Sequence, residues 1–113
     1  MITNQAEISK ITAHLPVSEE QIAAFCRKWH IRELAFFGSV LRDDFGPESD
    51  VDVLFTLMPG HVCDWDNFWG MKEELEQMFG REVDFIQKHL IEESPNWLRR
   101  KLILSTCRTV YAA

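Results

Sequence analysis

The sequence predicts an α/β (α+β) fold in which a small sheet is flanked by helices. Two observations predict this class: segments with helical spacing alternate with short apolar runs typical of strands, and helix-capping residues stand between them. A third is that no repeat, low-complexity tract or long linker divides the 113 residues, of which 46% are hydrophobic. We therefore expect a single domain over residues 1–113, with residues 1–16 as an N-terminal extension.

The first third of the chain predicts two helices followed by a strand. Three apolar residues at helical spacing indicate a short helix that ends before a proline: Ile8, Ile11 and Leu15. A clearer helix begins at Ser18, with Gln21 in capping-box position, and its apolar face comprises Ile22, Phe25, Cys26 and Trp29. The apolar run 34–37 predicts a buried strand that Gly38 ends, and residues 39–42 predict one helical turn.

Residues 51–57 carry the strongest strand pattern of the chain, because their apolar side chains lie between a polar loop and a Pro-Gly turn. The segment 64–79 then returns to helical spacing, with Gly80 where a C-terminal cap belongs. One predicted helical face comprises Trp65, Phe68, Trp69, Leu75 and Phe79. We interpret the aromatic residues of this face as core rather than as a platform for stacking bases.

The last third of the chain predicts a strand, a helix and a final short strand. Residues 82–87 alternate polar and apolar side chains, which is typical of a strand. A helix begins at Ser94 and Pro95, with serine as the cap and proline in the first turn, and ends near residue 105. Residues 109–111 predict the last strand, so the whole order favours a sheet covered by helices.

Two aspartates stand at the start of the strand over 51–57. Side chains alternate along a strand, so Asp50 and Asp52 lie on the same face, about 6–7 Å apart. Their charges repel, and at least one pKa is raised unless a cation binds between them. Together with phosphate oxygens, paired carboxylates suit Mg²⁺. A solitary Asp-x-Asp is also common in solvated or capping positions, so the prediction of a metal site depends on the neighbouring motifs.

The Gly38-Ser39 pair supplies the second half of a predicted site. Glycine allows the backbone to approach a phosphate closely, and free amides at the start of a helical turn attract anions. The Ser39 hydroxyl can donate to the same phosphate. Arg42, one turn later, could contact a phosphate or brace the loop. Gly-Ser alone usually marks a turn, but here it ends one strand shortly before the aspartates begin the next.

Asp84 is a third carboxylate, in the predicted strand over 82–87. Val83 and Phe85 flank it on the opposite face, so Asp84 faces the same way as Glu82 and Ile86. If this strand pairs with the strand over 51–57, Asp84 meets the first two carboxylates across the ladder. Three carboxylates could then hold two metal ions about 3.5–4 Å apart, the arrangement that supports in-line phosphoryl chemistry.

Composition limits the classes of partner. With 12 basic and 18 acidic residues, a net charge of −6, the chain lacks the basic character of a broad nucleic-acid-binding surface. The three cysteines form no CxxC pair and the four histidines show no ligand spacing, which argues against a disulfide framework or a zinc site. There is no signal-peptide pattern and no run approaching the roughly 18 apolar residues of a membrane span. We therefore expect a soluble cytoplasmic protein with no membrane partner.

The segment GSVLRDDFGPESDVDVLF, residues 38–55, joins Gly-Ser, ten further residues and Asp-x-Asp. This spacing resembles the signature of the polymerase-beta-like nucleotidyltransferase superfamily. With the later REVDFI segment, the chain is similar more narrowly to the minimal nucleotidyltransferases, the MntA-type antitoxins of HepT–MntA modules. The resemblance covers residues 20–111 and implies a polymerase-beta-like fold with a small mixed sheet flanked by helices.

The same resemblance implies roles for the predicted site residues. Gly38 and Ser39 would hold the triphosphate of ATP, Asp50 and Asp52 would bind both Mg²⁺ ions, and Asp84 would complete the site. The implied activity is transfer of AMP from ATP to a hydroxyl group. In the antitoxin subgroup the acceptor is a tyrosine of the partner, a HepT-type ribonuclease toxin. This modification, together with tight binding, silences the toxin.

One departure from the family pattern leaves an alternative open. Relatives usually have glycine after the motif arginine, where this chain has Asp43. Its negative charge could weaken nucleotide binding or simply face solvent. The alternative function is therefore a nucleotide-binding antitoxin that masks its toxin sterically, with little or no catalysis. A free-standing enzyme that modifies a small molecule is a further alternative, but it would need an acceptor-binding surface built by oligomerisation.

Overall fold

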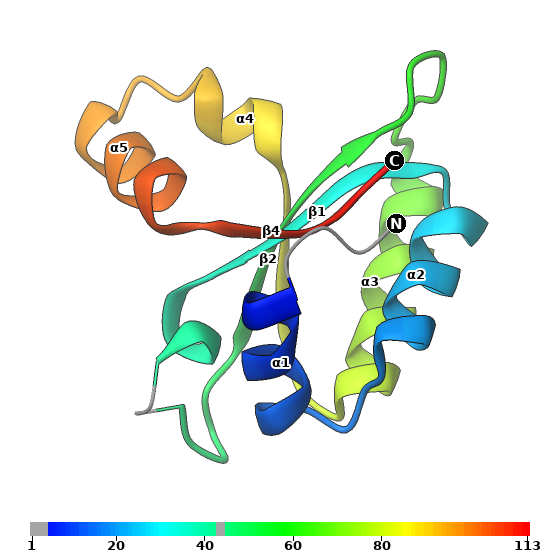
Figure 1. The fold of residues 1–113 in the computed structure, drawn as a ribbon. Helices are drawn as coiled ribbons and strands as arrows, with labels where there is room; N and C mark the ends of the chain where they lie inside the picture. Colours follow the sequence, from blue (N-terminus) through cyan, green and yellow to red (C-terminus); the bar gives the residue numbers. More distant parts are fainter. Residues whose placement is uncertain (1–4, 43–44) are drawn as a thin grey trace.

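A computed structural model of the protein describes residues 5–42 and 45–113 (Figure 1). In chain order they form α1 (Gln5–His14), α2 (Glu19–Lys28), β1 (Ile31–Phe37), the 3₁₀ helix η1 (Gly38–Leu41), β2 (Val51–Leu57), α3 (Trp65–Phe79), β3 (Val83–Gln87), α4 (Lys88–Glu92), α5 (Trp97–Thr106) and β4 (Arg108–Ala112). No helix within the described ranges is long and apolar enough to cross a membrane.

The strands form one mixed sheet in the order β3-β2-β1-β4. β1 is antiparallel to both β2 and β4, whereas β2 and β3 run parallel. The parallel pair is joined by α3, which crosses one face of the sheet (Figure 1). The predicted fold class, a small mixed sheet with flanking helices, is therefore confirmed.

One face of the sheet carries α1, α2 and α3 (Figure 1). Apolar side chains of these helices meet every second residue of the strands in a cluster that we call the major core. Phe55 of β2 stacks on Phe85 of β3 with ring centroids 4.0 Å apart, which ties the parallel strands together. Ile8 and Ile11 of α1 are fully buried here, so the segment that we expected to be an N-terminal extension packs into the core.

In the part of the chain that the structure describes, the helices on the opposite face are α4 and α5 (Figure 1). The fully packed part of this face, which we call the minor core, consists of Ala35, Leu54, Ile91 and Ile103. Phe37 and Ile86 are only partly buried against this cluster. The minor core is therefore small, and polar groups at the strand ends occupy part of this face.

Local signals account for most helix boundaries. The Ser18–Gln21 capping box is present at the start of α2, as predicted. Gly80 ends α3 in the left-handed conformation, with φ 68°, which glycine adopts without strain. α5, however, begins later than predicted: Asn96, not Ser94, accepts the capping hydrogen bond, from the backbone amide of Arg99. An asparagine oxygen reaches the same amides as serine, so either residue could have capped this helix.

Two other predictions differ from the structure. The aromatic face of α3 is not wholly core: Leu75 and Phe79 are buried, but Trp65 is 73% exposed and Trp69 44% exposed. Both tryptophans lie in the first part of α3, which Trp65 begins. The short helix α4, directly after β3, was not predicted, because five residues are too few for helical spacing to be recognised.

Candidate active site

The predicted carboxylates meet at the start of the parallel strand pair. Asp52 and Asp84 are directly opposite each other in the register of β2 and β3, and Asp50 precedes β2 by one residue. Leu54 and Ile86, two positions further along each strand, belong to or pack on the minor core. Because side chains alternate along a strand, the Asp52 and Asp84 carboxylates lie on the α4–α5 side of the sheet.

The backbone of Gly38 lies against the Asp52 carboxylate. Gly38 has φ 78°, and a Cβ atom built there would come within 2.3 Å of Asp52 Oδ2. Both the left-handed conformation and the close approach therefore require glycine at this position. Ser39 follows in η1 and is partly buried, and the Arg42 amide donates to the Ser39 carbonyl at 2.9 Å. The segment between β1 and β2 is thus fitted closely to the first carboxylate of β2.

Burial raises the pKa of Asp52 to about 6, with the charges of Asp84 and then Asp50 adding to the effect and the charge of Arg42 opposing it. The ionised form of Asp52 therefore carries a penalty from its burial beside the Asp50 and Asp84 carboxylates. A cation bound among them would remove that penalty, because an opposite charge favours the ionised form.

The donor set fits a hard divalent cation in its chemistry, since carboxylate oxygens are the ligands that Mg²⁺ prefers. Among the residues that the structure describes, however, no three His, Cys, Asp or Glu side chains are grouped so that they could hold a metal ion. Asp50 and Asp84 are both exposed. The protein alone thus supplies a repelling carboxylate pair, and phosphate oxygens of a substrate would have to complete a coordination sphere.

Two residues that the sequence did not single out fix these strand starts. Arg81 donates through Nη1 to the carbonyls of Gly46 and Ser49, at 3.0 Å for Ser49, and its guanidinium lies 4.2 Å from the Phe45 ring. It therefore braces the loop that leads into Asp50. Glu76 accepts from the Val83 amide at 3.0 Å at the start of β3. Neither residue belongs to a recognisable sequence motif, because each acts through a contact with backbone groups that forms only in the folded chain.

A cavity of about 370 Å³ opens beside the Asp52 carboxylate, and we call it the site cavity. On the sheet side it is lined by Phe37, Gly38, Leu41, Arg42 and Asp52, and on the α5 side by Leu102, Ile103 and Thr106. A cavity of this size, apolar with a few polar groups, is typical of a small-molecule site. The α5 residues were not predicted, since they are remote in sequence and their position depends on how α5 packs.

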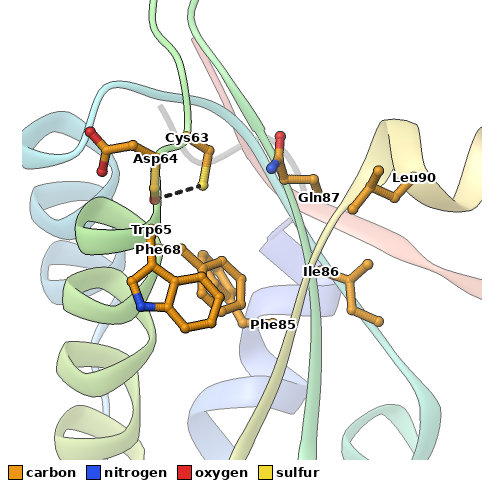
Figure 2. A pocket seen from close by; sticks show the side chains of 8 residues that line it. All are labelled: Cys63, Asp64, Trp65, Phe68, Phe85, Ile86, Gln87 and Leu90. Carbon is orange, nitrogen blue, oxygen red and sulfur yellow. Dashed lines mark hydrogen bonds between the residues drawn. The ribbon is translucent and has the colours of Figure 1, made fainter.

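A second cavity, about 410 Å³, lies at the far end of β3, and we call it the distal cavity (Figure 2). It is lined by Cys63, Asp64, Trp65, Phe68, Phe85, Ile86, Gln87 and Leu90. Figure 2 shows Trp65 and Phe68 of α3 gathered beside Phe85 of β3. None of the predicted site residues lines it, so its size alone does not make it the candidate active site.

The structure brings together most of the predicted constellation. Gly38, Arg42 and Asp52 line the site cavity, and Asp84 stands beside Asp52. Ser39 adjoins them in η1 without lining the cavity. Asp43, whose charge we expected to matter near the phosphates, lies outside the described residues.

Comparison with known proteins gives a consistent result. The profile of the nucleotidyltransferase domain family matches residues 18–110. A protein of Methanocaldococcus jannaschii named "Putative protein adenylyltransferase MJ1379" is 30% identical over 64 residues, which are 57% of this chain and 64% of that protein. The match thus spans somewhat less than two-thirds of that relative's length.

Three solved structures share the fold at low sequence identity. A toxin-antitoxin crystal structure with AMP-PNP has a TM-score of 0.65 at 15% identity, covering 86% of this chain and 75% of that one. A structure described as a "putative minimal nucleotidyltransferase" has a TM-score of 0.63 at 21% identity, covering 94% and 98%. A complex of a tri-AMPylated Shewanella oneidensis HEPN toxin with its MNT antitoxin has a TM-score of 0.57 at 15% identity, covering 84% and 70%.

Proposed function

Because this chain belongs to the nucleotidyltransferase domain family, we propose that it transfers AMP from ATP to a hydroxyl group of a partner protein. The partner would be a HepT-type toxin and the acceptor a tyrosine, so that the chain acts as an antitoxin. The observation that carries the proposal is the fit of Gly38 against Asp52, with Asp84 directly across the ladder. That geometry joins a close-approach backbone to paired carboxylates beside an open cavity.

In the proposed reaction the acceptor oxygen forms a bond to the α-phosphorus of ATP. The bond from that phosphorus to the bridging oxygen breaks, and pyrophosphate leaves. Bound Mg²⁺ would supply charge neutralisation at the phosphates, as metal ions do in phosphoryl transfer generally. Asp50 and Asp52 would hold it, together with Asp84.

The chain's own residues would do the remaining work. The backbone at Gly38 and Ser39 would face the triphosphate, and the Arg42 side chain, which lines the site cavity, would offset its charge. Asp84 would take the proton of the attacking hydroxyl.

A tyrosine acceptor would come from another molecule. This chain has one tyrosine, Tyr111, and its side chain is 3% exposed within the major core. It therefore cannot enter the site of a second copy without unfolding of the sheet. The complex of an AMPylated HEPN toxin with its antitoxin, which shares this fold, supports a toxin as the acceptor. The three free cysteines suit a reducing cytoplasm as the setting.

The test is incubation with ATP, Mg²⁺ and a purified HepT-type toxin from the same genome, followed by intact mass of both proteins. We expect the toxin to gain one or more AMP units, and to gain none with the Asp50→Ala/Asp52→Ala variant. An unmodified toxin in the wild-type reaction would contradict the proposal.

The second candidate function is steric masking of the toxin without catalysis. It is favoured by the absence, among the described side chains, of a three-ligand group for a metal ion. A wild-type chain that binds ATP and inhibits the toxin, yet releases no pyrophosphate, would support this candidate over the first.

A further inference from the structure

α5 exposes an unusual amount of apolar surface for a ten-residue helix. Trp97 is 62% exposed, and Leu98 and Leu102 are each 63% exposed. With Lys101 and Ser105 these residues line a shallow hollow of about 300 Å³, and we call the five residues the α5 ridge. Contiguous exposed apolar surface on a small domain commonly marks a surface that another molecule covers.

The α5 ridge is continuous with the candidate active site. Leu102 lines both the hollow of the ridge and the site cavity, where it faces Gly38 and Asp52. Ile103, the next residue, is 6% exposed and anchors α5 in the minor core. A molecule that covers the ridge would therefore extend to the opening beside the Asp52 carboxylate.

The ridge also lies in the most basic part of an acidic chain. Residues 94–113 contain four basic residues and no Asp or Glu, whereas the whole chain has a net charge of −6. Arg100 is turned back, since it donates to the Ser94 carbonyl at 2.6 Å. Arg99 and Lys101 are exposed, so their charge is available beside the apolar side chains. An occupant of the ridge should therefore combine apolar side chains with Asp or Glu.

From this continuity and charge we infer that the α5 ridge is the docking surface for the acceptor protein, and that the docked segment is apolar and acidic. The inference rests on the proposed function, to which it adds the surface that brings the acceptor hydroxyl to the site. The two exposed leucines favour a protein over RNA, because single-stranded RNA is bound on several aromatic platforms in succession and the ridge has one tryptophan. A second copy of this chain would cover the ridge without supplying an acceptor tyrosine.

The test compares two apolar surfaces of similar exposure. The Leu98→Ser/Lys101→Glu variant alters the ridge away from the site cavity. The matched control is Val62→Ser/Trp65→Ala, at positions that are 79% and 73% exposed and line neither the ridge nor the site cavity. Calorimetric titration with the purified HepT-type toxin, without nucleotide, gives the Kd for docking. Intact mass after addition of ATP and Mg²⁺ separately reports AMP transfer, and thermal unfolding checks both folds.

We expect the ridge variant to raise the Kd for the toxin about tenfold or more, as loss of an interface hot spot does, while the control stays within about twofold. If the Kd values change in this way but no variant, including the wild type, transfers AMP, the docking inference is supported and the proposed function is wrong. Three results would overturn the inference: an unchanged Kd in the ridge variant, no binding of wild-type protein to the toxin, or ridge-dependent binding of a labelled single-stranded RNA in place of the toxin.

Discussion

The two faces of the sheet are built differently. The face under α1, α2 and α3 is packed by the major core, which takes side chains from every strand. The face under α4 and α5 has a minor core of four buried residues, and beside it lie Asp52, Asp84 and the site cavity. The same strands supply both: Val53 and Phe85 point to one side, and Asp52 and Asp84 to the other.

This difference means that stability and chemistry can be altered separately. Burial of apolar area is the main favourable term in folding, and nearly all of it lies on the major-core face. Burial, and then the charges of Asp84 and Asp50, raise the pKa of Asp52, so its ionised carboxylate detracts from stability. Substitutions on the major-core face should therefore lower stability and spare activity, whereas substitutions at the site should lower activity and spare stability.

The largest expected effect is on the site face. Asp52→Asn should lower the rate of AMP transfer by about 10³-fold or more, because it removes a carboxylate charge that would hold Mg²⁺ at the phosphates. The measurement is the initial rate of toxin modification by intact mass. Asp66→Asn, in the exposed first turn of α3, is the matched control and should keep the wild-type rate. An equal loss of transfer rate in both variants would show that the rate does not depend specifically on the charge of Asp52.

On the opposite face, Phe55→Ala should lower the free energy of unfolding by about 3–5 kcal/mol, because it empties a fully packed position stacked on Phe85. Ile91→Ala in the minor core should cost nearer to 2 kcal/mol, the low end for such truncations (about 2–5). Urea titration gives both values. Transfer per folded molecule should remain within a few fold for Phe55→Ala. If Ile91→Ala proved the costlier substitution, the contrast between the two cores would be wrong.

At the junction of the faces, Gly38→Ala should lower the transfer rate by about 10²-fold, since the new Cβ would displace the Asp52 carboxylate. It should also cost about 1–2 kcal/mol of stability through left-handed strain. Gly60→Ala is a close control: Gly60 has φ 89°, with nothing within 4 Å of a built Cβ. It should show the strain without the loss of transfer, and a parallel loss in both variants would argue against the Gly38–Asp52 contact.

The smallest effect is on pH dependence. The folded-state pKa of Asp52 is about 6, above the ordinary 3.8, so the folded chain retains a proton that the unfolded chain has released. In metal-free protein the stability should fall as pH rises from about 4 to about 6, by about 1 kcal/mol after allowance for solvent screening. Asp52→Asn should lose this component and be the more stable protein at pH 8. Thermal unfolding of both proteins across that range is the check, and identical pH profiles would count against the raised pKa.

The sequence predicted the strands that bear the site because one is an apolar run bounded by a polar loop and a Pro-Gly turn, and the other alternates polar and apolar residues over most of its length. The strand over residues 51–57 agrees with β2, and residues 82–87 with β3 at all but one position. The condition that the two strands pair is met in the register Asp52 opposite Asp84. What the sequence could not give is contact between distant segments. The Arg81 brace, the α5 lining of the site cavity and the exposure of Trp65 each depend on tertiary packing.

The raised pKa of Asp52 has an evolutionary consequence. A substitution that neutralises this residue relieves repulsion and disturbs neither core, so selection for stability alone favours losing it. The α5 ridge, on a separate element, would survive such a change. Under the proposed function, a single mutation that stabilises the protein would therefore convert a chain that modifies its partner into one that only binds it.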